Sequence, residues 1–321
     1  MNILFLSSEV APFAKTGGLA DVAGSLPKAL RRLGHDVRVV LPFYRTVRQR
    51  FAPEATGVEV EIPVAGFVER ATIRRCEHDG VPVYFVDHPG YFGRDGLYGT
   101  PTGDWPDNAE RFGFFCRAAL AMLPLVGFRP DILHCNDWQT GLVPVLRRTE
   151  LAGDPFLAGC GTLFSIHNLG YQGLFPDAAL AILGLDPRLL TMHALEYWGN
   201  LSLLKGGIVF ADRVATVSPT YRDETLGAEL GLGFEGILRA RGDDYSGILN
   251  GLDGDLWNPA ADAALPAPYA VDNLDGKAAC KAALQRELGL ARRPDVPIVA
   301  LVSVAMITPS HGRLSVTLVM R

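Results

Sequence analysis

Short apolar runs alternate with helical patterns at the start of the chain. Residues 2–8 form an apolar run of the β type, residues 19–33 repeat apolar positions with helical spacing, and residues 36–41 form a second apolar run. This order predicts a strand, a helix and a parallel strand. Gly34 suits a helix C-terminal cap, whereas Pro27 should kink the helix or delay its regular part.

The next segments predict an antiparallel addition to this sheet. Residues 58–64, 71–76 and 81–86 are rich in β-forming residues, and His78-Asp79-Gly80 supplies a turn between the last two runs. Residues 89–107 are rich in Gly, Pro, Tyr and Asp, which predicts a long loop.

Alternation of helix and strand patterns resumes after this loop. Helices are expected at residues 108–123, 140–148 and 201–210, and strands at residues 131–135, 162–166, 213–217 and 246–249. Such alternation predicts an α/β fold with a parallel sheet covered by helices. We expect this Rossmann-like domain to occupy residues 1–251.

The last part of the chain differs in composition. Residues 252–276 carry several Pro residues and many Ala and Asp residues, which is typical of an extended connection between domains. A helical pattern at residues 277–288 and a buried strand pattern at residues 297–303 predict that residues 277–321 are the incomplete start of a second α/β domain. One helix and one strand are too little to bury a core of their own.

Composition and charge exclude several classes of protein. With 48% hydrophobic and 20% charged residues among 321, the chain has enough apolar material for a folded core. A formal net charge of −5 without a long basic run argues against nucleic acid as a partner. No apolar run reaches the roughly 20 residues of a membrane helix. Five scattered cysteines fit neither a disulfide framework nor zinc-ligand spacing, which favours a reducing cytoplasm.

Polar residues follow the predicted strands. In open parallel sheets, ligands bind beyond the carboxyl ends of the strands. The residues in that position are Ser7, Ser8, Glu9, Asn136, Asp137, Trp138, Gln139, His167, Asn168, Ser218, Asn250 and Gly251. Each alone is more often a cap or a turn residue, but together they predict a polar pocket at one edge of the sheet.

The sequence Lys15-Thr16-Gly17-Gly18 is the sharpest local feature of the chain. Paired glycines let backbone N–H groups approach a phosphate, and lysine adds a positive charge. An ordinary glycine-rich loop is the alternative, because such turns are common. The segment matches neither a Walker loop nor the Gly-x-Gly-x-x-Gly fingerprint, but its place after the first strand favours an anion site.

A longer match points to a family. Residues 7–22, Ser-Ser-Glu-Val-Ala-Pro-Phe-Ala-Lys-Thr-Gly-Gly-Leu-Ala-Asp-Val, resemble the N-terminal signature of bacterial glycogen synthases and plant starch synthases. Further similar motifs are Asp107-Asn108-Ala109-Glu110-Arg111-Phe112, residues 135–141, residues 166–173, Lys205-Gly206-Gly207, residues 217–221 and residues 247–251. The resemblance spans about residues 1–303.

This resemblance implies a GT-B fold, in which two Rossmann-like domains close over a cleft. It implies transfer of glucose from ADP-glucose to the non-reducing end of an α-1,4-glucan such as glycogen, with retention of configuration. Neither a metal ion nor a separate cofactor is implied, and neither a membrane nor nucleic acid is an expected partner. ADP-glucose is favoured over UDP-glucose by the resemblance alone.

The resemblance also implies roles for residues of the donor site. Lys15, Gly17 and Gly18 should lie against the ADP-glucose phosphates. Asp21 should help to hold the donor, and Asn250 should lie near the nucleotide end of the cleft.

Further roles follow for the reacting centre and the acceptor. His167 should contact the transferred glucose, and Asp137 should lie close to the reacting centre. Glu9, Trp138 and Asn168 resemble residues that line the acceptor glucan, where an aromatic face suits a sugar ring. For Trp138, a buried aromatic of the core is the alternative.

Nothing after residue 303 resembles the family. The family has an arginine and a lysine directed at the donor phosphates where this chain has Val304 and Pro309, and residues 304–321 hold no Asp or Glu. We therefore interpret the sequence as a truncated chain with an aberrant tail. Losing one such charge-stabilising group costs about 10²- to 10³-fold in rate, so we expect the chain to be inactive alone. Residues 314–320, apolar and uncharged, should be mobile or prone to aggregate.

Two alternatives to a glucan synthase remain. One is a non-catalytic fragment that binds a glucan or a nucleotide sugar with half of a cleft. The other is a different sugar-nucleotide transferase of the same fold, against which the Lys15-Thr16-Gly17-Gly18 signature argues.

Overall fold

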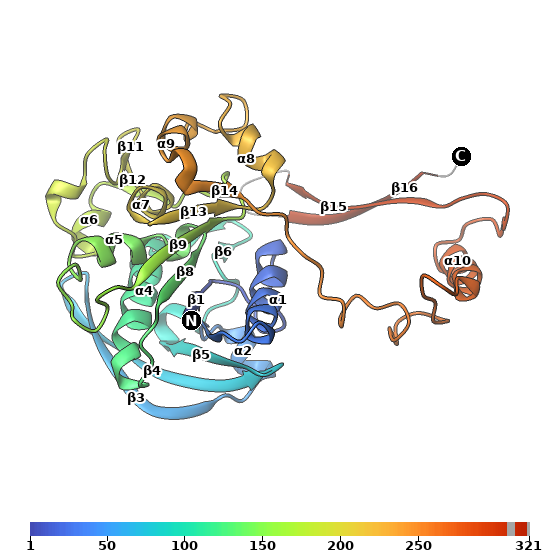
Figure 1. Ribbon diagram of the computed structural model, residues 1–321, viewed down its shortest axis with the longest axis horizontal. Helices are drawn as coiled ribbons and strands as arrows, with labels where there is room; N and C mark the ends of the chain where they lie inside the picture. The colour runs from blue at the N-terminus through green and yellow to red at the C-terminus, as the bar shows by residue number, and fades with distance from the viewer. Residues whose placement is uncertain (307–311, 320–321) are drawn as a thin grey trace. The chain divides into compact units, whose positions relative to one another are not determined.

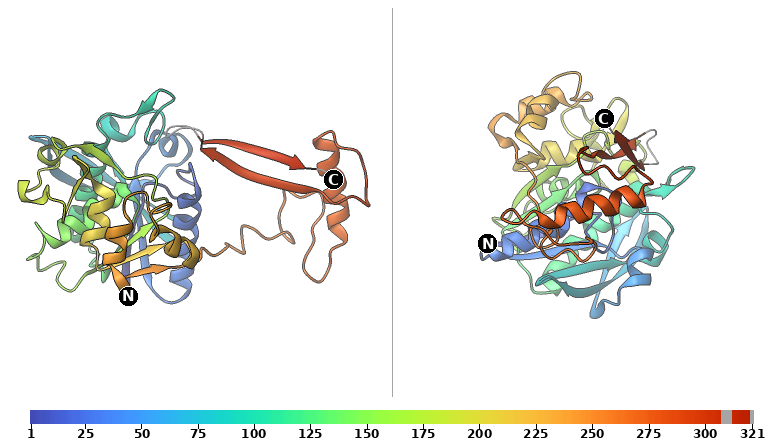
Figure 2. Two further views of the ribbon diagram at one scale, coloured as in Figure 1. Left: turned by 90° about the horizontal axis from the view of Figure 1, so that it is seen from above. Right: turned by 90° about the vertical axis from the view of Figure 1, so that its right-hand side faces the viewer.

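The chain forms two compact units. The computed structural model describes residues 1–306 and 312–319. One unit comprises residues 1–100 and 104–250, and the other comprises residues 101–103 and 251–321. Figures 1 and 2 show the elements of both units.

A nine-stranded sheet is the centre of the first unit, in the order β14-β13-β9-β8-β1-β2-β5-β4-β3. Its strands are β1 (Asn2–Leu6), β2 (Asp36–Pro42), β3 (Glu54–Val64), β4 (Phe67–His78), β5 (Val81–Asp87), β8 (Ile132–Asn136), β9 (Gly161–Ile166), β13 (Arg213–Thr216) and β14 (Tyr245–Gly247). The strands from β14 to β5 are parallel. Strands β3 and β4 add an antiparallel hairpin, so both features predicted from the sequence are confirmed.

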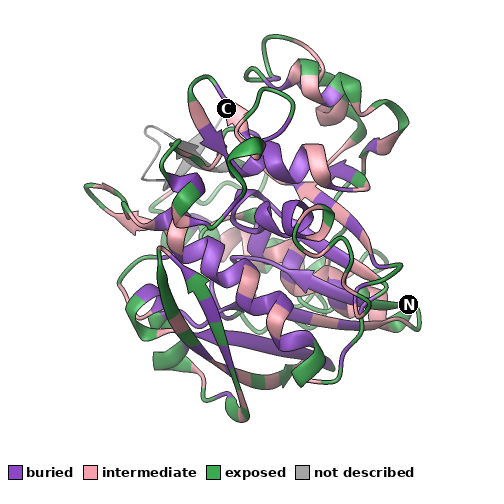
Figure 3. Cartoon of the chain, turned by 90° about the vertical axis from the view of Figure 1, so that its left-hand side faces the viewer, coloured by how far each residue is buried: buried purple, intermediate pink, exposed green. Residues whose placement is uncertain are grey.

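Helices cover both faces of this sheet. They are α1 (Gly18–Arg32), α2 (Arg45–Arg50), α3 (Pro89–Phe92), α4 (Asn108–Leu125), α5 (Leu142–Arg148), α6 (Ala179–Ile182), α7 (Leu203–Phe210), α8 (Pro219–Thr225) and α9 (Glu235–Ala240). Helix α1 lies on one face of the sheet, and α4, α5 and α7 lie on the other, as Figure 1 shows. Figure 3 shows that the buried residues concentrate between these layers.

Short elements complete the first unit. They are β6 (Gly99–Thr100), β7 (Gly103–Asp104), β10 (Leu174–Pro176), β11 (Glu196–Tyr197), β12 (Asn200–Ser202), and the 3-10 turns Trp138–Thr140, Pro187–Leu189 and Gly242–Asp244. The prediction of a loop at residues 89–107 was therefore wrong in part, because α3, β6 and β7 lie in or overlap it. The first helix begins at Gly18 and continues through Pro27, so its regular part is not delayed. Gly34 has φ +88° and donates its N–H to the carbonyl of Arg31, which confirms the predicted cap.

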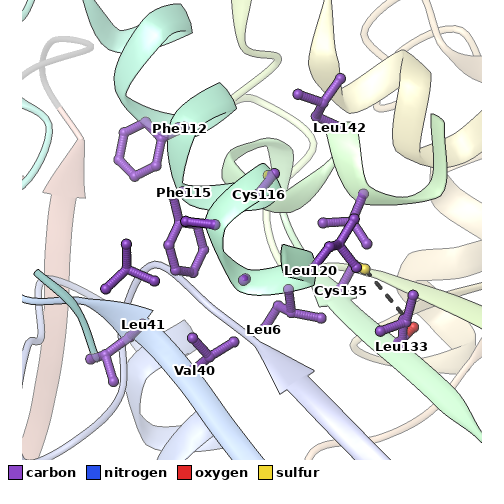
Figure 4. Close-up of a cluster of buried hydrophobic side chains, with 14 of the residues drawn as sticks. Leu6, Val40, Leu41, Phe112, Phe115, Cys116, Leu120, Leu133, Cys135 and Leu142 are labelled. Atoms are coloured by element: carbon purple, nitrogen blue, oxygen red, sulfur yellow. Dashed lines mark hydrogen bonds between the residues drawn. The ribbon is translucent and has the colours of Figure 1, made fainter. Parts of the chain in front are cut away.

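The core lies between α4 and the sheet. Phe112 and Phe115 of α4 and Leu6 and Val40 of the sheet are each 0% exposed. Figure 4 shows these side chains facing one another. Because α4 carries apolar residues on nearly every side, it is buried along most of its length. This packing fixes where the loops after β1 and β8 begin.

The Lys-Gly-Gly motif lets α7 approach its neighbours closely. A Cβ added at Gly206 would lie 2.8 Å from Leu195 and 2.9 Å from Val145 of α5. A Cβ at Gly207 would lie 2.3 Å from the ring of Phe164 in β9. These separations are too short for carbon atoms, so the packing of α7 requires both glycines.

We expect Gly207→Ala to lower the free energy of unfolding by about 1–3 kcal/mol, because the new methyl group would displace the buried ring of Phe164. Gly236→Ala in α9 is the matched control, since a Cβ at this helical glycine meets no atom within 4 Å. The control should be neutral or stabilising by up to about 1 kcal/mol. Urea denaturation measures both, and equal stabilities would contradict the packing argument.

Within the described part of residues 251–321, the regular elements are the helix α10 (Asp275–Glu287) and the strands β15 (Val299–Met306) and β16 (Gly312–Val319). The helix confirms its prediction, and residues 248–274 hold no helix or strand beyond an isolated bridge between Ala270 and Asn273. Strand β15 pairs antiparallel with β16. Its first residue, Val299, is 62% exposed, so the predicted burial of this strand is wrong there.

The tail at residues 304–321 falls partly on β16. Residues 314–319 pair with β15, whereas Pro309 and Met320 lie outside the described residues. No helix within residues 1–306 and 312–319 is long and apolar enough to cross a membrane.

Candidate functional site

The sheet has a topological switch point between β1 and β8. The chain continues from β1 to β2 on one side, whereas β8 and β9 lie on the other side. Ligands of open α/β sheets bind in the crevice beyond the carboxyl ends of the strands at such a point. The segments that follow β1 and β8 carry Glu9 and Asp137, so two of the predicted site residues follow the strands on either side of this switch point.

The carboxylate of Glu9 organises the loop that follows β1. Its side chain is buried, and its Oε2 accepts the backbone N–H groups of Thr16 at 2.5 Å and Gly17 at 3.2 Å. Its Oε1 accepts the hydroxyl of Thr16 at 2.6 Å and that of Tyr98 at 2.7 Å. Two oxygens accept at most about four hydrogen bonds, so this carboxylate is saturated.

These bonds bear on the expectation for the glycine-rich loop. The N–H of Gly17 donates to Glu9 in this structure, so the role expected for Gly17 rests on its open space and not on its N–H. The first turn of α1 begins at Gly18 and has N–H groups without helical partners, which favour an anion. The ammonium of Lys15 donates to Asp21 at 2.6 Å, with side chains 50% and 42% exposed. The structure thus brings four predicted donor residues together.

The fold itself does not require glycine at positions 17 and 18. Gly17 has an extended φ of −151°, and a Cβ added at Gly17 or Gly18 would meet no atom within 4 Å. At Gly24, by contrast, a Cβ would lie 2.7 Å from the carbonyl oxygen of Ala11. Open space at a glycine pair suits the close approach of a ligand to the backbone.

Asp137 is held in a strained backbone conformation at the end of β8. Its φ of 55° and ψ of 179° lie in a backbone region that is unfavourable by about 1–3 kcal/mol for residues other than glycine. Its N–H donates to the carbonyl of Ser165, and its carbonyl accepts the N–H of Thr140. Its Oδ1 accepts the N–H of His167 at 2.7 Å. Strain of this kind concentrates at functional sites.

Burial sets the protonation of Asp137 and His167. Desolvation raises the pKa of Asp137 to about 7, although N–H donors from His167 and Asn168 oppose the shift. Desolvation lowers the pKa of His167 to about 4, so its imidazole is neutral at pH 7. Its Nε2 lies 3.0 Å from Oδ1 of Asn136, whose Nδ2 donates to the carbonyl of Leu6. Nε2 therefore carries the proton, and Nδ1 is the acceptor.

Asp137 should make the stability of the chain depend on pH. Because the folded carboxyl binds its proton more tightly than the unfolded chain does, the free energy of unfolding should fall as pH rises from about 4 to about 7. The contribution is about 1.4 kcal/mol per pKa unit. The asparagine of Asp137→Asn is neutral at every pH and should lack this pH-dependent contribution. The variant should therefore gain stability relative to the wild type towards pH 8.

Chemical denaturation between pH 4 and 8 measures this difference. The buried histidines His134 and His167 occur in both proteins, so their opposite pH dependence cancels in the comparison. Parallel pH profiles for wild type and variant would contradict the raised pKa.

For Trp138, the structure favours the core alternative. The side chain is only 7% exposed, and its ring lies edge to face with Phe112 at 5.1 Å and Phe175 at 5.5 Å between centroids. A Cβ added at Gly173 would lie 2.8 Å from the indole. Little of the ring is left for a sugar to stack on.

Other residues of the predicted pocket act as local caps. Oδ1 of Asn168 accepts the N–H of Gly170, and Oγ of Ser218 accepts the N–H of Tyr221 at the start of α8. Asn250 is exposed at the end of the first unit. Asn168 and Asn250 therefore lie after β9 and β14, as predicted, but the structure gives no contact that defines a ligand role.

Tyr98 is the residue of this site that the sequence did not reveal. It lies in the segment predicted as a loop, about 90 positions from Glu9, to which it donates a hydrogen bond. Within the described residues, no three or more His, Cys, Asp or Glu side chains gather as metal ligands. The five cysteines are free thiols.

The fold defines an open α/β protein with a lysine-containing loop and a helix N-terminus at the switch point, the place where ligands of such folds bind. Residues 2–240 match the model of the starch synthase catalytic domain. The chain belongs to the starch synthase catalytic domain family, as its resemblance predicted.

Comparisons with individual proteins agree. The chain is 56% identical over 304 residues to a glycogen synthase of Syntrophotalea carbinolica and 51% identical over 304 residues to glycogen synthase 2 of Geobacter sulfurreducens. Each match covers 94% of this chain, which spans 63% of the length of those relatives. The solved catalytic domain of starch synthase IV from Arabidopsis thaliana, bound to ADP and acarbose, has a TM-score of 0.82 at 37% identity. That match covers 90% of this chain and 59% of the other, and it confirms the GT-B fold class.

Proposed function

We propose that this chain carries the donor-binding and acceptor-facing part of a glycogen synthase, which transfers glucose from ADP-glucose to the non-reducing end of an α-1,4-glucan with retention. Relatives at 51–56% identity are glycogen synthases, and the matching starch synthase IV is described as bound to ADP and acarbose. The observation that carries the proposal is the position of Lys15 beside the N-terminus of α1 at the switch point, where its ammonium pairs with Asp21 of the first turn.

The donor diphosphate would bind between the Lys15 ammonium and the first turn of α1. The ion pair of Lys15 with Asp21 is half exposed, and exposed pairs of this kind contribute at most about 1 kcal/mol. The ammonium can therefore turn towards a phosphate at little cost. Open space at Gly17 and Gly18 would let the diphosphate approach the backbone.

The reacting glucose would lie beside Asp137 and His167. Negative charge develops on the diphosphate as the glycosidic bond breaks, and the Lys15 ammonium and the helix N-terminus would stabilise that charge. The neutral imidazole of His167 presents Nδ1 as an acceptor for a glucose hydroxyl. Asp137, with a pKa of about 7, could hold or release a proton near the reacting centre at neutral pH.

The proposal also includes a residue that faces the glucan acceptor and the cellular compartment of the reaction. Asn168 follows β9 next to His167, so we propose it as an acceptor-facing residue, with no role for the buried face of Trp138. We place the reaction in the cytoplasm, where the five free cysteines stay reduced.

We expect Lys15→Ala to weaken binding of ADP roughly tenfold, because a charge-assisted hydrogen bond to phosphate is lost. Isothermal titration calorimetry with ADP measures this. Arg188→Ala is the matched control, since Arg188 also forms an exposed ion pair, with Asp186, and its removal changes the net charge equally. An equal loss of ADP affinity in both variants would show that the net charge of the chain, and not this site, determines the affinity.

A second measurement tests transfer itself. We expect the 321-residue chain, incubated with labelled ADP-glucose and glycogen, to incorporate label near the background rate, because Val304 and Pro309 replace the two cations that the family resemblance implies. Robust incorporation that depends on the chain would contradict this expectation. Binding of ADP and glycogen without transfer would favour the alternative of a binding fragment.

A further inference from the structure

A chain of hydrogen bonds leads from α4 to the donor loop. Glu9 accepts bonds from Thr16, Gly17 and Tyr98, and the hydroxyl of Tyr98 lies 2.8 Å from that of Ser8. A carboxylate has no proton to give, so Tyr98 donates to Glu9 and Ser8 donates to Tyr98. The position of the Tyr98 hydroxyl therefore constrains the carboxylate that orients the loop.

Two residues at the start of α4 hold Tyr98 in place. Nδ2 of Asn108 donates to the carbonyl of Tyr98 at 2.8 Å, and a guanidinium N–H of Arg111 donates to the carbonyl of Leu97 at 3.1 Å. The same guanidinium donates to Oδ1 of Asn108 at 2.6 Å and to the carbonyl of Tyr91 at 2.8 Å. Asn108 and Arg111 thus form a clamp that holds the carbonyls of the two peptide bonds that flank Tyr98.

Burial makes this clamp rigid. Asn108 is 2% exposed and Arg111 is 0% exposed. A buried charge with three acceptors has one favourable arrangement, because any displacement leaves a desolvated donor without a partner. Water cannot replace these bonds easily at such depth. The clamp therefore transmits the position of α4 to the segment that carries Tyr98.

We propose that Asn108 and Arg111 are positioning residues for the donor site, which fix the Lys15–Gly18 loop through Tyr98 and the carboxylate of Glu9. They touch neither the loop nor a ligand, and they act by holding the hydroxyl of Tyr98 against Glu9. The inference rests on the proposed function for the identity of the ligand, a nucleoside diphosphate. The mechanical coupling itself is a property of the described chain.

The test measures the loop directly and then its ligand. In Asn108→Ala, we expect amide hydrogen exchange at Thr16 and Gly17 to be roughly tenfold faster, which corresponds to the loss of about one charge-assisted hydrogen bond. ADP affinity, measured by calorimetry, should fall roughly fivefold. Asn2→Ala is the matched control, because Asn2 also donates to a backbone carbonyl, that of Arg129, at the opposite end of β1.

A double substitution separates coupling from general destabilisation. Tyr98→Phe removes the hydroxyl that links the clamp to Glu9, and it should itself speed exchange at Thr16 and Gly17. If Asn108 acts through that hydroxyl, adding Asn108→Ala to Tyr98→Phe should change loop exchange little further. Additive effects would overturn the proposal, as would unchanged loop exchange in a folded Asn108→Ala variant.

The two readouts keep this inference apart from the proposed function. If the wild-type chain does not bind ADP, the proposed donor site fails, while loop exchange still decides the coupling. If Asn108→Ala does not fold, the coupling is tested with Tyr98→Phe alone, because this substitution keeps the aromatic ring and removes only the hydroxyl. Loop exchange in Tyr98→Phe equal to that of the wild type would then refute the coupling.

Discussion

The site depends on one buried carboxylate whose four acceptor positions are all used. Glu9 follows β1 at the switch point of the sheet and fixes the loop by accepting from both the backbone and the side chain of Thr16 and from the backbone of Gly17. A buried acceptor is costly to leave without partners, so the loop has one favourable conformation. That conformation holds Lys15 and the first turn of α1, the groups proposed to bind the donor phosphates, next to each other.

A negative charge behind the proposed anion site would oppose binding if its charge were not compensated by hydrogen-bond donors. Here the Glu9 carboxylate is surrounded by two N–H dipoles and two hydroxyl dipoles, all pointing towards it, which screen its charge. In the proposed site, the groups left to attract an anion are the Lys15 ammonium and the N-terminus of α1. The Glu9 carboxylate weakens the attraction of the site for a diphosphate, but it also fixes the conformation of the loop. Preorganised donors are the groups that stabilise developing charge best.

Local patterns predicted most of the first unit because strands such as β1, β2 and β5 are nearly continuous apolar runs and Gly34 marks the end of α1. They failed where the outcome depends on distant partners. Tyr98 gave no signal, since its partner Glu9 is about 90 positions away. Strand β15 was detected, but the pattern could not show that its partner would be the antiparallel strand β16. The edge position of Asp137 was predictable, whereas its positive φ and raised pKa follow from tertiary packing alone.

Glycines show why the same residue type can be structural or functional. Gly206 and Gly207 match a family motif, yet they are explained completely by the contacts a Cβ would make with α5, β9 and Leu195. Gly17 and Gly18 belong to an equally glycine-rich motif, but no neighbour and no left-handed backbone demands them. A small residue that the fold does not need points to something outside the fold that approaches it. The empty space before Gly17 and Gly18 is therefore stronger evidence for a ligand than the motif itself.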